Sequence, residues 1–166
     1  MSRESLIEAY VAALPFAAVA IVAVPGGGCR VETAAPGAPG EAIAQQYYFK
    51  PSHIELVLGA ASLADGPIDQ SPDAVAALIE RTAVAMGAPY QTAAELRADA
   101  EKEVDKIVAK VEAARQAGGM KQTNRQYKAY RLAQIAKGEK ATSYSVFFQR
   151  FVTSMVRDVA VTGRMI

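Results

Sequence analysis

The feature that most constrains this chain is an apolar run of sixteen residues, from Ala9 to Val24, that contains no charged side chain. A helix that spans a bilayer needs roughly 20 such residues, and Pro15 divides the run. A secretory signal would carry positive charge before the run, whereas the first eight residues contain two Glu and one Arg. We therefore expect the run to be buried in a protein that has no membrane partner and is cytoplasmic or lies within a macromolecular assembly.

Two structures are compatible with residues 5–24. Helical spacing of apolar residues over 2–14 predicts a short helix that stops at Pro15, and the β-branched and small residues over 16–24 predict a buried strand. Pro-Gly-Gly-Gly then breaks the chain, and alternation over 29–35 predicts a second strand that completes a β-hairpin. The alternative is one apolar helix kinked at the proline.

Helical patterns account for most of the remaining chain. The expected helices cover residues 41–49, 52–63, 71–86, 92–117, 121–137 and 143–160. Ser52 with Glu55, and Thr92 with Glu95, have the spacing of capping boxes. Ser71 precedes a proline and is expected to be an N-cap.

These elements predict a mainly α protein in two portions. A small N-terminal α/β portion (residues 1–70), which could contain the β-hairpin, is expected to pack on a C-terminal portion (residues 71–166) that forms a bundle of about four helices. The helix over 92–117 carries a narrow apolar stripe on a densely charged surface. Such a stripe suits one neighbouring helix of the same chain or a coiled-coil partner.

The side chains that most catalytic and metal sites need are scarce. The chain has one histidine, His53, and one cysteine, Cys29. A zinc site needs several such ligands, and a catalytic triad would have to use His53, whose place at the start of an expected helix favours a capping or surface role. The glycine-rich segment before Cys29 lacks the Lys and Ser or Thr of a P-loop. We therefore predict a non-enzymatic protein with no cofactor and no bound metal.

Charge is divided unevenly along the chain. Residues 1–100 carry five Lys and Arg against eleven Asp and Glu, whereas residues 101–166 carry thirteen against six. The excess is concentrated in residues 121–151, which hold seven Lys and Arg and one Glu. Surfaces that serve solubility alone mix both signs. Such asymmetry is typical of a nucleic-acid partner, or of an acidic face that docks on a basic one.

The last expected helix has two different halves. Its apolar half includes Phe147, Phe148, Phe151 and Met155, which we expect to be core. Its other half, which includes Gln149, Arg150, Thr153 and Arg157, contains no acid and is made mainly of side chains that contact bases or phosphates in nucleic-acid complexes.

The pattern predicts a non-enzymatic, nucleic-acid-associated accessory or packaging protein that uses a basic C-terminal helical hairpin. Eight cations are expected to neutralise phosphates, and two tyrosines are expected to stack on bases. These residues are Lys121, Arg125, Lys128, Arg131, Lys137, Lys140, Arg150 and Arg157, with Tyr127 and Tyr130. The alternative is a structural subunit of a homo-oligomer or larger assembly, joined through the 92–117 helix or by docking of the acidic part of one chain on the basic part of another.

Overall fold

A computed structural model describes residues 2–34, 43–63, 66–118 and 121–163. The chain divides into two compact units: Pro15–Ala98, which we call the sheet unit, and Met1–Leu14 with Asp99–Ile166, which we call the helical unit. This division differs from the boundary at residue 70 drawn from the sequence in two ways. The first helix groups with the last ones, and residues 71–98 group with the strands. The mainly α character with a smaller α/β part is confirmed.

The sheet unit contains a five-stranded antiparallel sheet in the order β4-β2-β1-β3-β5. The strands are β1 (Ala17–Ala23), β2 (Cys29–Ala34), β3 (Ile43–Phe49), β4 (Gly66–Ile68) and β5 (Gln91–Thr92). β1 and β2 form the expected hairpin, so residues 5–24 are a helix followed by a strand. The hairpin turn requires glycine at residue 28, where φ is +83° and a Cβ would lie 2.5 Å from the carbonyl oxygen of Ile68.

The helix predicted over residues 41–49 is wrong, since the described part of that segment is strand β3. β3 pairs with β1 on the side opposite β2, with Ala17 against Phe49 and Val19 against Tyr47. The Tyr47 and Phe49 side chains are fully buried in the core of this unit. Pairing satisfies the backbone of the buried strand β1 on both sides, and this long-range requirement outweighs the local helical pattern.

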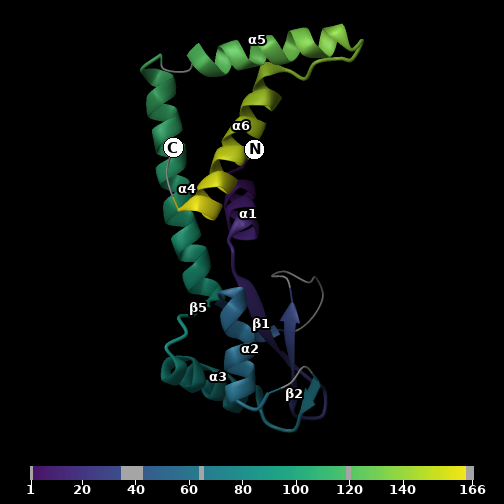
Figure 1. Ribbon diagram of the computed structural model, residues 1–166, viewed down its shortest axis with the longest axis vertical. Coiled ribbons are helices and arrows are strands. Elements are labelled where there is room, and N and C mark those ends of the chain that lie inside the picture. The colour runs from purple at the N-terminus through teal and green to yellow at the C-terminus, as the bar shows by residue number, and fades with distance from the viewer. Residues whose placement is uncertain (1, 35–42, 64–65, 119–120, 164–166) are drawn as a thin grey trace. The chain divides into compact units, whose positions relative to one another are not determined.

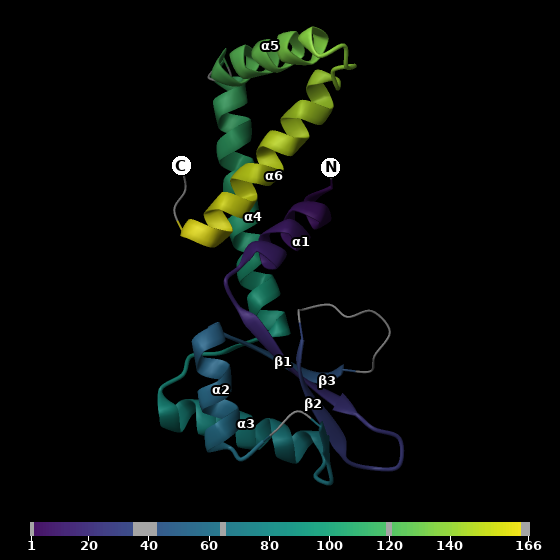
Figure 2. The same cartoon turned by 45° about the vertical axis from the view of Figure 1, so that its right-hand side comes forward.

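Helices α2 (Pro51–Ala60) and α3 (Pro72–Met86) cover one face of the sheet (Figure 2). The core between them contains Val19, Ile21, Val31, Tyr47 and Phe49 of the strands and Ile54, Val57, Val75 and Ile79 of the helices. The Tyr47 hydroxyl donates a hydrogen bond to the Glu80 carboxylate. Burial and this carboxylate both raise the pKa of Tyr47 well above its usual range.

Two of the three helix caps expected from the sequence form. The Ser71 hydroxyl accepts from the Ala74 amide, and Ser143 likewise caps the last helix. Thr92 and Glu95 exchange the two bonds of a capping box. The capping box expected from Ser52 is wrong, because α2 begins one residue earlier, at a proline that needs no amide partner.

The helical unit consists of α1 (Arg3–Ala13), the part of α4 (Ala93–Gln116) from Asp99 onward, α5 (Lys121–Ala136) and α6 (Tyr144–Thr162). α1 lies along α6 (Figures 1 and 2). The core of the helical unit contains Leu6 and Ile7 of α1, Ala100, Val104, Ile107 and Val111 of α4, and Val152, Val156 and Val159 of α6. In the described residues, no helix combines the length and the apolar character needed to cross a bilayer.

The structure decides one expectation for these helices and corrects another. The apolar stripe of α4 is buried against α1 and α6 of the same chain, which is the intramolecular alternative drawn from the sequence. The aromatic half of α6 is only partly core, since Phe147, Phe148, Phe151 and Met155 are half-buried. The fully buried positions belong to smaller side chains one step around the helix, such as Val156.

Replacing Ile107 by alanine should lower the free energy of unfolding by about 2–5 kcal/mol, because its side chain is 1% exposed within the core of the helical unit. Leu132→Ala is the matched control, because Leu132 is 69% exposed on α5, and it should change that free energy by no more than about 0.5 kcal/mol. Urea denaturation followed by circular dichroism measures both. If Leu132→Ala lowers the free energy of unfolding as much as Ile107→Ala does, another molecule must cover α5.

Candidate nucleic-acid interface

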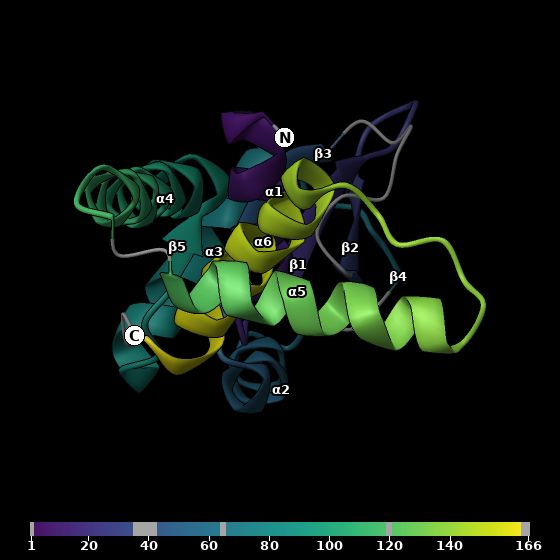
Figure 3. The same cartoon turned by 90° about the horizontal axis from the view of Figure 1, so that it is seen from above.

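α5 contacts the rest of the helical unit through one narrow seam. Among its described side chains only Thr123 is buried, and Tyr127, Tyr130 and Gln134 follow it at intervals of four, three and four residues as half-buried positions. The helix lies across the N-terminal end of α6 (Figures 1 and 3). More than half of its circumference is therefore exposed.

Aromatic rings form most of this seam. The Tyr127 ring lies 5.1 Å from the Tyr144 ring and 5.3 Å from the Phe147 ring, and the Tyr130 ring lies 5.4 Å from Phe147, measured between centroids. Such pairs stabilise by about 0.5–1.5 kcal/mol beyond the burial of their surface. The rings attach the middle of α5 to the first turn of α6.

Both tyrosine hydroxyls bind the segment that joins the two helices. The Tyr127 hydroxyl donates to the carbonyl oxygen of Thr142 at 3.0 Å. The Tyr130 hydroxyl lies 3.2 Å from Thr142 Oγ1 and accepts the Thr142 amide at 3.3 Å. These bonds, together with the nearby positive charge of Arg150, lower the pKa of Tyr130. The two rings predicted to stack on bases thus have a structural role in this arrangement, and their stacking stays a prediction.

Four of the eight predicted cations lie together on the exposed side of α5. Lys121, Arg125, Lys128 and Arg131 are all exposed, and at 100° per residue they fall within an arc of roughly 120°. The first three lie opposite the seam, and Arg131 lies beside it. They extend over about 15 Å of the helix. The sequence of α5 contains no Asp or Glu, so nothing on this helix neutralises them.

The other four cations continue around the end of α5 and onto α6. Lys137 and Lys140 lie in the connection after α5, and both are exposed. Arg150 and Arg157 are exposed two turns apart on α6, a rise of about 10 Å. The cations therefore extend from one side of α5 over its connection to α6.

The acid-free half of α6 is less exposed than the sequence indicated. Gln149 is half-buried, and the Thr153 hydroxyl donates to the Gln149 carbonyl oxygen at 2.8 Å. This back-bonding occupies the Thr153 hydroxyl within the helix. Arg150 and Arg157 thus remain as the exposed polar contacts that this half offers.

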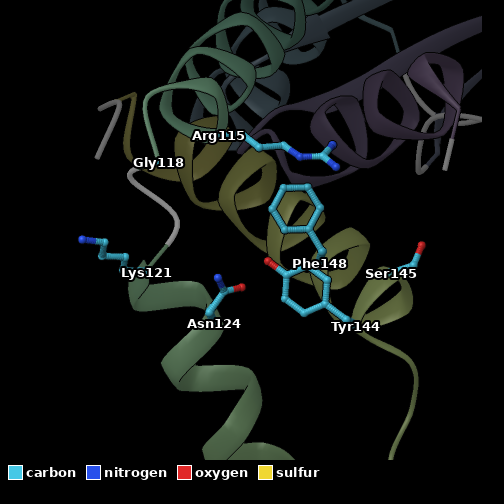
Figure 4. A pocket seen from close by; sticks show the side chains of 7 residues that line it. All are labelled: Arg115, Gly118, Lys121, Asn124, Tyr144, Ser145 and Phe148. Atoms are coloured by element: carbon cyan, nitrogen blue, oxygen red, sulfur yellow. The ribbon is translucent and has the colours of Figure 1, made fainter.

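A pocket of about 420 Å³ opens where α4 ends and α5 and α6 begin (Figure 4). Its described lining combines two cations, two hydrogen-bonding side chains and two aromatic rings, and includes no carboxylate. The lining residues are Arg115, Gly118, Lys121, Asn124, Tyr144, Ser145 and Phe148. Only Lys121 was selected from the sequence as a site residue. Arg115 was not selected because it comes after the acidic part of α4 in the sequence. Only the tertiary structure brings it close to α5 and α6.

The described residues contain no group of three or more His, Cys, Asp and Glu side chains arranged to hold a metal ion. Cys29 is buried in the sheet unit, and burial raises the pKa of its thiol. A buried thiol with a raised pKa is a poor nucleophile. The basic surface and the adjoining pocket are thus the candidate site.

Removing both seam hydroxyls, by Tyr127→Phe with Tyr130→Phe, should loosen α5 while the rings stay packed. Each lost hydrogen bond is expected to cost about 0.5–1.5 kcal/mol. Hydrogen exchange read by mass spectrometry should show faster exchange in α5, with the core of α6 unchanged. Tyr144→Phe is the matched control, since its ring belongs to the same cluster. Equal protection of α5 in the double variant and the control would show that the hydroxyls do not hold the helix.

The chain matches no family model, no curated protein and no solved structure.

Proposed function

We propose that the helical unit binds nucleic acid through its basic surface, as a non-enzymatic accessory or packaging protein in the cytoplasm or within a macromolecular assembly. The observation that supports this most is the exposed side of α5, where Lys121, Arg125 and Lys128 lie opposite the seam and Arg131 lies beside it, on a helix without a carboxylate. The seam leaves this side uncovered in the described structure.

The spacing of these cations suits a phosphate backbone. Successive cations on α5 are separated by about 4.5–6 Å along the helix axis. Duplex DNA carries one negative charge per ≈ 1.7 Å of its axis, so a 15 Å stretch faces several phosphates. Flexible Lys and Arg side chains that meet phosphates give affinity without sequence preference. Binding is therefore expected to be electrostatic and weakly dependent on sequence.

A second candidate function is that of a structural subunit, and one observation favours it. Leu132 and Ile135 are 69% and 59% exposed on the same side of α5 as the cations, and protein interfaces combine apolar residues with arginine. The sheet unit has a net charge of −4 and the helical unit +5, which suits acidic-to-basic docking between chains. Pairing through α4 is not part of this proposal, because its stripe is buried within the chain.

The direct test is the salt dependence of binding to a labelled 30-base-pair duplex, measured by fluorescence anisotropy. The variant Arg125→Gln, Lys128→Gln, Arg150→Gln should still fold, since exposed charges contribute little to stability. If each of the three meets a phosphate, the slope of log affinity against log salt should become shallower by roughly 2.7 units.

A second triple variant controls for the loss of net charge. Lys50→Gln, Arg81→Gln, Lys102→Gln removes three exposed cations that lie off the basic surface and should leave the slope nearly unchanged. An equal change in both variants would show that net charge alone drives binding. Absence of duplex and single-strand binding by the parent protein at low salt would overturn the proposal. Concentration-dependent association that is lost in Leu132→Ser, Ile135→Ser would then favour the structural subunit.

A further inference from the structure

We propose that the pocket between α4, α5 and α6 binds one nucleotide unit, with its phosphate at Arg115 and its base against Tyr144 and Phe148. This inference deepens the proposed function and rests on it, because the bound nucleotide would belong to a single strand that also contacts α5. The same chemistry is shared by a free nucleotide, and the experiment below distinguishes the two sources.

Arg115 supplies the anion-binding group. Its side chain extends across the pocket above the Phe148 ring (Figure 4). A guanidinium can bind phosphate oxygens in a bidentate manner. The described lining has no carboxylate that would compete for it, and the first turns of α5 and α6 contain no acid.

Two rings supply a stacking surface. Tyr144 and Phe148 lie one turn apart on α6, with centroids 6.1 Å apart and planes inclined by 26°. Tyr144 is 37% exposed and Phe148 is half-buried, so part of each ring remains open to the pocket. Nucleobases stack on such rings whatever their identity.

Asn124 adds a group that can read a base edge. Its amide carries both a donor and an acceptor, and it points toward the rings from the first turn of α5 (Figure 4). The volume of about 420 Å³ lies within the roughly 300–1,000 Å³ of small-ligand sites. The pocket thus combines a phosphate contact, a stacking surface and an edge contact in one recess of suitable size.

Lys121 connects this pocket to the basic surface of α5. It lines the pocket, and its ammonium points outward, away from the rings (Figure 4). It is also the first cation of the exposed α5 stripe. A strand that follows Lys128, Arg125 and Lys121 would therefore reach the pocket.

A base in a duplex must be flipped out before it can enter such a recess. This step costs free energy that an unpaired base does not need to spend. The arrangement therefore favours single strands.

The test compares a 12-nucleotide single strand that contains one 2-aminopurine, a duplex of the same sequence, and adenosine monophosphate. Stacking on the rings should quench the 2-aminopurine fluorescence of the single strand. Phe148→Leu keeps apolar bulk beside the core of the helical unit and removes a pocket ring that does not belong to the α5 seam. It should weaken single-strand binding roughly 5- to 150-fold, abolish most of the quenching and leave duplex affinity within about 2-fold, since a paired base does not reach the rings.

A second variant guards against a folding defect in the first. Arg115→Gln with Asn124→Ala changes two exposed side chains of the pocket, whereas Arg81→Gln with Gln70→Ala removes the same charge and one amide from exposed positions of the sheet unit. Only the pocket pair should reduce quenching.

The outcomes separate this proposal from the function on which it rests. Duplex and single-strand binding that neither pocket variant alters would overturn the nucleotide site and leave the proposed function standing. Adenosine monophosphate binding that is lost in Phe148→Leu, without binding of either oligonucleotide, would support a site for a free nucleotide and overturn the proposed function. Absence of binding by all three probes would overturn both.

Discussion

The burial of α1 against α4 and α6 is the interaction on which the candidate site depends. Leu6 and Ile7 come from the start of the chain, and their core partners, such as Ile107 and Val156, lie about 100 and 150 residues later. The Arg3 side chain adds two bonds to the Asp105 carboxylate, at 2.7 and 2.8 Å. This core fixes the three helices relative to one another, and α6 in turn carries the rings on which α5 rests.

α5 exposes most of its charged side chains because only a small part of its surface is buried against the rest of the helical unit. Helices in proteins owe most of their stability to tertiary packing, and α5 has a single described side chain that is buried. The contacts of Tyr127 and Tyr130 with Phe147 and Thr142 compensate for this with ring packing and hydrogen bonds. Attachment along one seam stabilises the helix while its cations remain exposed. A broader apolar contact would leave less of its circumference for a ligand.

Local signals predicted those parts of the protein that depend on a few neighbouring residues. The caps at Ser71 and Thr92, the glycine turn before Cys29 and the exposure of the α5 cations all follow from nearby sequence. β3 could not be predicted in the same way, because its strand form comes from pairing with β1. The pocket could not be predicted either, because it also depends on residues that are distant in the sequence. Arg115 and Phe148 lie 33 residues apart, and only the return of α6 toward the end of α4 brings them to one recess.

The grouping of α1 with the C-terminal helices has a consequence for the order of folding during synthesis. The sheet unit is one continuous segment, Pro15–Ala98, so its contacts can form as soon as that segment leaves the ribosome. The apolar face of α1, by contrast, is not fully covered until α6 has been synthesised. Chains fold from the N-terminus as they emerge, and exposed apolar surface at that stage promotes aggregation. α1 is thus synthesised before the sheet unit but is among the last elements to be fully covered, and Leu6 and Ile7 are candidate contacts for chaperones on the nascent chain.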